Sequence, residues 1–197
     1  MKKIVSLILI ATLMLSLCSC FPFSEDEDKI VVDPTAKPPE TREELYSYYN
    51  QIKRGMKKEQ VEALFGKGTV KQSDDGENMF TLYINEEKSA GVNIIYSFDD
   101  IVRTKLLYYN KAGDLTKFSN PFDEKKISEI EEKDQVAKAN EVLGGAGLEI
   151  AYEFSQNSPT DYSKIIVWYN KNGSSFQLNT NNETITKVIF NVDPSRR

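Results

Sequence analysis

The sequence predicts an α+β fold of two tandem modules, each a helix-turn-helix packed on an antiparallel sheet of three or four strands. Three observations predict it. Apolar residues recur first at helical spacing and then in alternation with polar residues, which is typical of strands. This order of elements occurs twice along the 197 residues. A hydrophobic content of 40% suits a folded chain with a core. The predicted modules span 41–118 and 119–197.

The chain begins with a pattern typical of export. Lys2 and Lys3 precede an uncharged apolar run over 4–17, which is short for a membrane-spanning helix of about 20 residues. We therefore predict a lipoprotein signal peptide over 1–19. The segment 20–40 combines clustered acids with prolines and cannot bury much apolar surface, so it predicts an extended tether.

The run Leu17-Cys18-Ser19-Cys20 resembles the lipobox of bacterial lipoproteins, with an apolar residue at −3 and a small one at −1. Cys18 fits less well as the modified residue, because Leu17 is bulky. The resemblance implies that Cys20 becomes the first mature residue and carries diacylglycerol and an acyl chain such as palmitate. Two or more chains are needed for stable anchoring. The expected location is therefore extracytoplasmic, lipid-anchored to the cell membrane, with no other cofactor.

In the first module, residues 41–44 match a capping box and begin a helix that should end at Gly55. A second helix over about 57–65 should end at Gly66. Period-two alternation then predicts strands, with Asp99-Asp100 as a hairpin turn between the last two. The predicted strands are 80–84, 92–98 and 102–110.

The second module repeats this order of two helices followed by strands. Asn120 and Pro121 should open a helix carrying Ile127 and Ile130, and Asp134 should cap the next one. The predicted strands are 148–154, 164–169, 175–180 and 185–192.

Identical residues support an internal duplication. Ile52 and Ile130 lie 78 positions apart, as do Gly66 and Gly144. Thr104-Lys105 and Thr186-Lys187 lie 82 positions apart, which requires a few extra residues in the second half.

The run 52–66, IKRGMKKEQVEALFG, resembles the signature of the SmpA/OmlA (BamE-like) lipoproteins and of the related β-lactamase-inhibitor-protein-like superfamily. Both share an apolar residue, Gly-Met, a short helix with Val and a closing Leu-Gly. A two-repeat chain is more similar to the inhibitor-like group than to single-repeat BamE, whose family role is outer-membrane protein assembly. The resemblance implies a non-enzymatic protein that binds another envelope or secreted protein.

The composition excludes several kinds of chemistry. The chain has no His, and its two Cys lie within the first twenty residues, which excludes imidazole-dependent catalysis and a thiol nucleophile in the body. A net charge of −5 argues against nucleic acid as a partner. The paired acids at 74–75 and 99–100 lie beside turns, where Asp stabilises local geometry. We therefore predict no enzyme and no metal site; a hydrolase with two carboxylates across one cleft is the less favoured alternative.

The duplicated strand suggests which face of the sheet is exposed. We expect Thr104, Leu106 and Tyr108, with their partners Thr186, Val188 and Phe190, to point inward. The same alternation turns Phe80 and Leu82 inward. An aromatic outer face then remains as the predicted protein-binding site, formed by Tyr83, Leu107, Tyr109, Ile166 and Trp168.

Two alternatives stay open for this face. The two halves can pack these side chains together, or the register can be shifted by one residue, which reverses every side chain. A deep pocket would instead favour a ligand-binding or stress-sensing lipoprotein.

Overall fold

The computed structural model describes residues 36–72, 79–109, 117–155, 158 and 160–192. The predicted signal peptide, the lipidation site Cys20 and the tether up to residue 35 lie outside this part of the chain, so they stay predictions. No helix among the described residues is long and apolar enough to cross a membrane.

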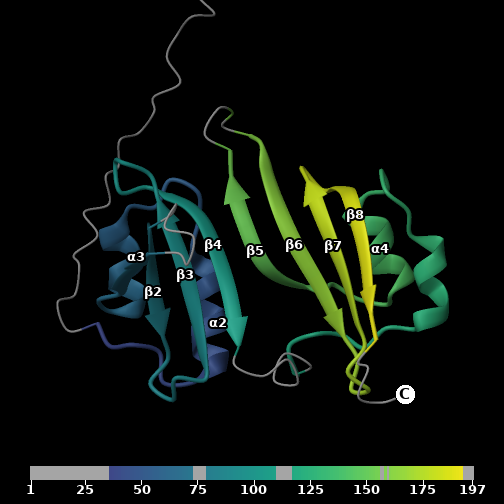
Figure 1. Cartoon of the computed structure of the whole chain (residues 1–197), viewed down its shortest axis with the longest axis horizontal. Coiled ribbons are helices and arrows are strands. Elements are labelled where there is room, and N and C mark those ends of the chain that lie inside the picture. Colours follow the sequence, from purple (N-terminus) through teal and green to yellow (C-terminus); the bar gives the residue numbers. More distant parts are fainter. Residues whose placement is uncertain (1–35, 73–78, 110–116, 156–157, 159, 193–197) are drawn as a thin grey trace, which may run out of the picture. The chain divides into compact units, whose positions relative to one another are not determined.

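The strands form one antiparallel sheet of eight strands that follow each other in chain order (Figure 1). They are β1 (Thr69–Gln72), β2 (Met79–Ile84), β3 (Ala90–Tyr96), β4 (Val102–Tyr109), β5 (Leu148–Phe154), β6 (Tyr162–Tyr169), β7 (Ser175–Asn181) and β8 (Thr184–Asn191).

The fold is therefore mainly β, and the prediction of two tandem helix-sheet modules is wrong. The strands do not form two sheets, because β4 pairs with β5, with Thr104 opposite Glu153 and Leu106 opposite Ala151. These pairs join residues more than forty positions apart. The hydrophobic pattern of a single strand does not say which distant strand lies beside it.

The first two helices form close to where the sequence predicts them. Helix α2 spans Arg42–Gln51, and the Thr41 hydroxyl accepts a hydrogen bond from the Glu44 amide at 3.1 Å. Helix α3 spans Lys58–Phe65 and ends at Gly66, whose φ of 73° is costly for other residues. Leu45 and Tyr49 of α2 are buried, as their helical spacing predicts.

The second half is less helical than predicted. The segment expected to form its first helix is a short 3-10 helix, η2 (Glu124–Glu129), followed by buried Ile130. Helix α4 spans Val136–Val142 and starts after Gln135, not after Asp134. The Asp134 carboxylate instead accepts a hydrogen bond from the Glu131 amide at 2.8 Å.

The two halves nevertheless repeat the same local contacts. The residue before α3, Lys57, bridges to Ile101, and the residue before α4, Gln135, bridges to Thr184. The first residue of α3 donates to the Asp100 carbonyl at 2.8 Å, and Val136 donates to the Glu183 carbonyl at 2.9 Å. Each helix is thus tied to the start of the last strand of its half.

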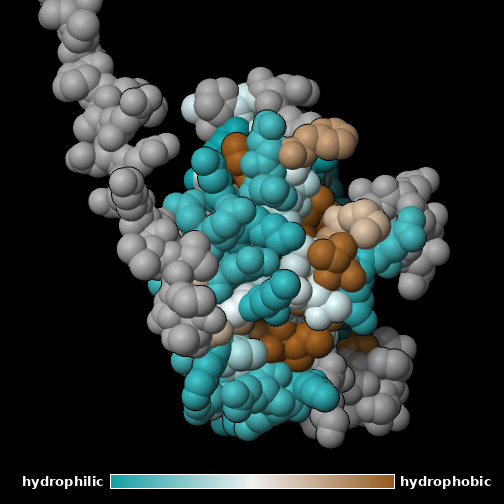
Figure 2. All heavy atoms as spheres, turned by 90° about the vertical axis from the view of Figure 1, so that its left-hand side faces the viewer, coloured by the Kyte–Doolittle hydropathy of each residue, from teal (hydrophilic) through white to brown (hydrophobic). Residues whose placement is uncertain are grey.

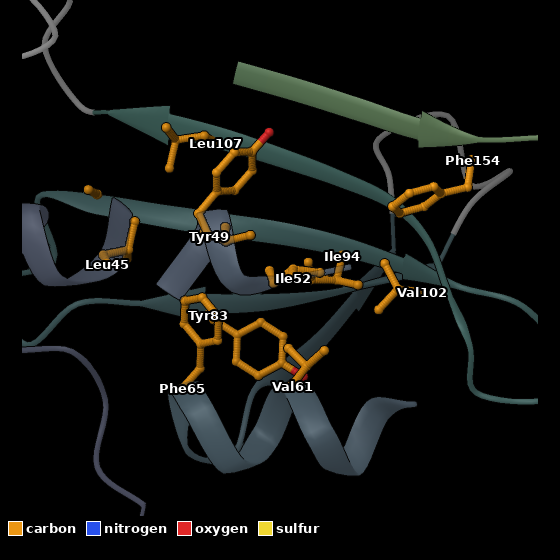
Figure 3. Close-up of a cluster of buried hydrophobic side chains, with 12 residues drawn as sticks. Leu45, Tyr49, Ile52, Val61, Phe65, Tyr83, Ile94, Val102, Leu107 and Phe154 are labelled. Atoms are coloured by element: carbon orange, nitrogen blue, oxygen red, sulfur yellow. The ribbon is translucent and has the colours of Figure 1, made fainter. Parts of the chain in front are cut away.

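Two clusters of buried side chains lie on the same face of the sheet, each beneath its own helices. In the first, Tyr49 of α2 and Phe65 of α3 pack with Tyr83 of β2 (Figure 3). In the second, Ala139 of α4 packs with Trp168 of β6. The helices and these side chains make up what we call the helix-covered face.

Two glycines allow the segments before β1 and β5 to approach this core closely. A Cβ on Gly68 would lie 2.7 Å from the Tyr83 ring, and one on Gly147 would lie 2.7 Å from the Trp168 ring. Real Cβ atoms do not approach other atoms so closely. The two glycines therefore hold equivalent places in the two halves, each against the large aromatic residue of the next strand.

We expect Gly147→Ala to destabilise the protein by about 1–3 kcal/mol, because the added methyl group must displace the fully buried Trp168. The measurement is the urea midpoint followed by tryptophan fluorescence. Lys187→Ala, at an exposed position of β8, is the control and should change stability by less than about 0.5 kcal/mol. An unchanged midpoint for Gly147→Ala would contradict the close packing.

Candidate functional site

The structure places the predicted binding residues in the core. Tyr83, Leu107, Ile166 and Trp168 are 2%, 4%, 7% and 0% exposed, and Tyr109 packs partly buried against the first cluster. All of them lie on the helix-covered face. The prediction that they form an exposed aromatic patch is therefore wrong.

For Leu107 and Tyr109 of β4 the error comes from aligning the last strands of the two halves one residue out of step. The sides of Tyr83, Ile166 and Trp168 are reversed as well, but these were predicted from alternation within β2 and β6. Val102 lies opposite Tyr96 in β4, and Ile185 lies opposite Thr180 in β8, each next to a shift in register. These equivalent residues are 83 positions apart, not 82. The slip reverses every side chain of β4, so Lys105 points inward although its charge suggests the opposite.

The other face of the sheet carries the side chains that alternate with the core residues, and we call it the open face. It mixes apolar and polar side chains, and Leu106 is exposed. Its members, from the register of the strands, include Lys71, Phe80, Leu82, Asn93, Ile95, Thr104, Leu106, Tyr108, Ala151, Glu153, Ser163, Ile165, Val167, Gln177, Asn179, Lys187 and Ile189. Several of these are the residues that the sequence predicted to point inward.

A groove of about 890 Å³ lies at the end of the sheet formed by the β5–β6 hairpin, and residues of β4 to β8 line it. Hydroxyl and amide side chains dominate where it meets the open face, among them Thr104, Ser163 and Asn179. Arg103 and Glu153 approach to 3.9 Å beside it, with both side chains about half exposed. Such a lining offers hydrogen bonds to a polar partner surface.

A fully exposed phenylalanine stands at the tip of the β3–β4 hairpin. Phe98 is 108% exposed, the largest value among the large hydrophobic residues described. The turn that carries it is held by hydrogen bonds from Asp100 N to the Ser97 carbonyl at 3.1 Å and from Ile101 N to the Ser97 hydroxyl at 3.2 Å. Asp100 in turn accepts from Lys58 at the start of α3.

Phe98 lies close to the groove. It lines a second cavity of about 390 Å³, which shares Arg103, Phe154 and Ser155 with the groove. The side of the molecule that faces left in Figure 1 is mostly hydrophilic, with several hydrophobic areas between the hydrophilic ones (Figure 2). An apolar anchor therefore stands next to a polar groove.

A group of charged side chains lies on the helix-covered face, where β4, β5 and β6 run side by side, and one of them, Lys105, is buried. Lys105 is only 4% exposed, and its Nζ lies 3.1 Å from Glu149 Oε1 and donates to the Tyr49 carbonyl at 3.1 Å. Lys164 lies 4.0 Å from the other oxygen of Glu149 and 2.6 Å from Glu183. Burial lowers the pKa of Lys105, and the charge of Glu149 opposes this shift.

The two carboxylates of this group do not resemble a catalytic pair. Glu149 and Glu183 both contact Lys164. Burial acts to raise the pKa of Glu183, but the hydrogen bonds from Lys164 and Tyr162 outweigh it, so that the pKa is lowered. A general acid needs a raised pKa. Within the described ranges, no three acidic or thiol side chains gather where they could hold a metal ion.

Comparisons with known proteins give the fold and nothing finer. No family model matches the sequence, and no curated protein matches it. The structure is similar to the 1.40 Å crystal structure of a candidate beta-lactamase inhibitor protein from Streptococcus mutans, with a TM-score of 0.54 and 13% identity. The similarity covers 77% of this chain and 98% of that one. The chain thus has a fold like that of the inhibitor-like group, while its resemblance to the SmpA/OmlA lipoproteins stays a prediction.

Proposed function

We propose that the protein binds another protein through the open face of its sheet, with Phe98 as the anchor, and that it is not an enzyme. The observation that carries the proposal is the complete exposure of Phe98 on a turn fixed by hydrogen bonds. Burying a phenylalanine side chain contributes about 1.5–3 kcal/mol, which the free protein forgoes. A fixed turn also loses little conformational entropy when a partner covers it.

The residues around Phe98 indicate which surface chemistry a partner protein needs in order to bind there. Asp99 and Asp100 follow Phe98 in the same turn, so an apolar pocket with basic side chains at its rim would fit. The groove beside it presents hydroxyl and amide groups, which suit the polar rim of an interface. The structural neighbour supports the proposal because it is described as a candidate inhibitor of an enzyme, which is a protein-binding role.

We also propose that the protein is a lipoprotein of the cell envelope, anchored through Cys20. The support is the charged start, the apolar run over 4–17 and the lipobox-like sequence that ends at Cys20. A partner would then be another envelope protein or a secreted protein that reaches the membrane surface.

We expect Phe98→Ser to weaken partner binding roughly thirtyfold, which corresponds to the loss of about 2 kcal/mol at an aromatic anchor. A photoreactive residue placed at position 98 should capture the partner in intact cells, and affinity is then measured with the purified partner. Val70 is the matched control, because it is also an exposed hydrophobic residue, 54% exposed, on β1. Equal binding by Phe98→Ser, or equal capture from position 70, would contradict the proposal.

The lipid anchor at Cys20 has a separate test. Cys20→Ser should abolish incorporation of radiolabelled palmitate and should release the protein from the membrane or leave it unprocessed. Cys18→Ser should keep the label, because Cys18 is discarded with the signal peptide. Continued labelling of Cys20→Ser would refute the assignment.

A further inference from the structure

A hollow of about 600 Å³ opens on the helix-covered face, between the end of α2 and strands β4 and β5. It shares Phe154 with both the groove and the cavity beside Phe98, but Lys53, Lys105 and Glu149 line only the hollow among these three. Its lining residues are Asn50, Ile52, Lys53, Arg54, Lys105, Glu149, Tyr152 and Phe154.

The hollow is rich in positive charge although the whole chain carries −5. Lys53, Arg54 and Lys105 line it, against the single acid Glu149. Further charges nearby are Lys164, which contacts Glu149, Glu183, which contacts Lys164, and Asp161, whose carboxylate interacts with Arg54. The balance at the hollow therefore favours an anion.

Lys105 is the group that makes the hollow more than a set of surface cations. Its side chain is only 5% exposed, so its charge has lost most of its hydration, and among the described residues its ion-pair partner is Glu149. The same Glu149 carboxylate is shared with Lys164 at 4.0 Å. Lys164 also pairs with Glu183 at 2.6 Å, so two carboxylates balance these two ammonium groups. The excess of positive charge at the hollow comes from the exposed Lys53 and Arg54.

The remaining walls are apolar and aromatic. The rings of Tyr152 and Phe154 lie 4.5 Å apart between centroids, and Arg54 lies over the Phe154 ring at 5.9 Å. The Arg54 guanidinium donates to the carbonyls of Ser155 and Asp161 on the β5–β6 hairpin. Its position is thus fixed, so little side-chain entropy is lost when a ligand binds.

We propose that this hollow binds a small organic carboxylate with an aromatic or apolar body. The carboxylate lies beside Lys53 and Lys105, and the body packs against Ile52, Tyr152 and Phe154. Charge complementarity selects the anion, and the aromatic walls select a flat or apolar body over a fully hydrated ion such as phosphate.

The probe is benzoate, followed by the NMR shifts of the Lys53, Tyr152 and Phe154 amides in the mature protein. Benzamide and benzylamine have the same ring with a neutral or a positive group, and inorganic phosphate has the charge without the ring. We expect saturable shifts with benzoate and at least about tenfold weaker binding of the other three. Equal shifts with benzamide, or none with benzoate up to about 10 mM, would overturn the proposal.

Two variants test the charges. Lys53→Gln, at an exposed position, should weaken benzoate several-fold, and Lys105→Met should weaken it at least about tenfold. Since Lys105→Met leaves Glu149 without its closest partner, Lys53→Gln keeps the test valid if that variant does not fold. Lys138→Gln, an exposed lysine of α4 paired with Asp134, is the control and should bind as wild type does. Unchanged binding by Lys53→Gln and by folded Lys105→Met would refute the site.

The affinity should also depend on pH in a definite direction. Burial lowers the pKa of Lys105, and a carboxylate bound beside it raises that pKa again, so benzoate should bind less tightly as the pH rises through it. Other charged or titratable groups also face Lys105. Tyr49 belongs to α2, and Lys53 follows that helix. Glu149 and Tyr152 belong to β5, and Lys164 belongs to β6. Phe98→Ser should leave benzoate binding unchanged, which separates this test from that of the proposed function. A flat pH profile would contradict the role of Lys105.

Discussion

The pairing of β4 with β5 is the constraint on which the rest of the structure depends. Only three pairs of residues form it, Thr104 with Glu153, Lys105 with Tyr152 and Leu106 with Ala151. Without it each half would expose a sheet edge with unpaired backbone groups, a surface that tends to aggregate. With it, both helical layers lie on one face, and the other face runs across strands of both halves.

The same pairing explains why charge is buried in the interior of an acidic protein. It brings Lys105 of β4 beside β5, so that its ammonium group lies against Glu149 and over the Tyr49 ring at 4.1 Å. Taking such a pair out of water costs several kcal/mol, which the ion pair, the hydrogen bond to the Tyr49 carbonyl and the ring contact offset. A hydrophobic pair at this position would avoid the free-energy cost of desolvation. The proposed ligand binding is therefore a reason for a lysine here that stability does not supply.

The two faces of the sheet therefore differ in role: one holds the core, and the other has the groove. The helix-covered face holds Trp168 and Tyr83 rigidly, each against a glycine that leaves room for its ring. The open face has the polar groove, and near the groove the hairpin turn carries Phe98. The first residue of α3, Lys58, donates a hydrogen bond to the Asp100 carbonyl, which ties the backbone of this turn to the helix.

Local features could be predicted from the sequence. Residue type and spacing predict the cap at Thr41, the end of α3 at Gly66 and most strand positions, because these depend on contacts within a few positions. The pairing of β4 with β5 and the inward side of Trp168 became apparent only in the folded chain. Pairing of distant strands leaves no local signal, and one extra residue at a register shift reverses the faces, so periodicity located the strands but not their inner sides.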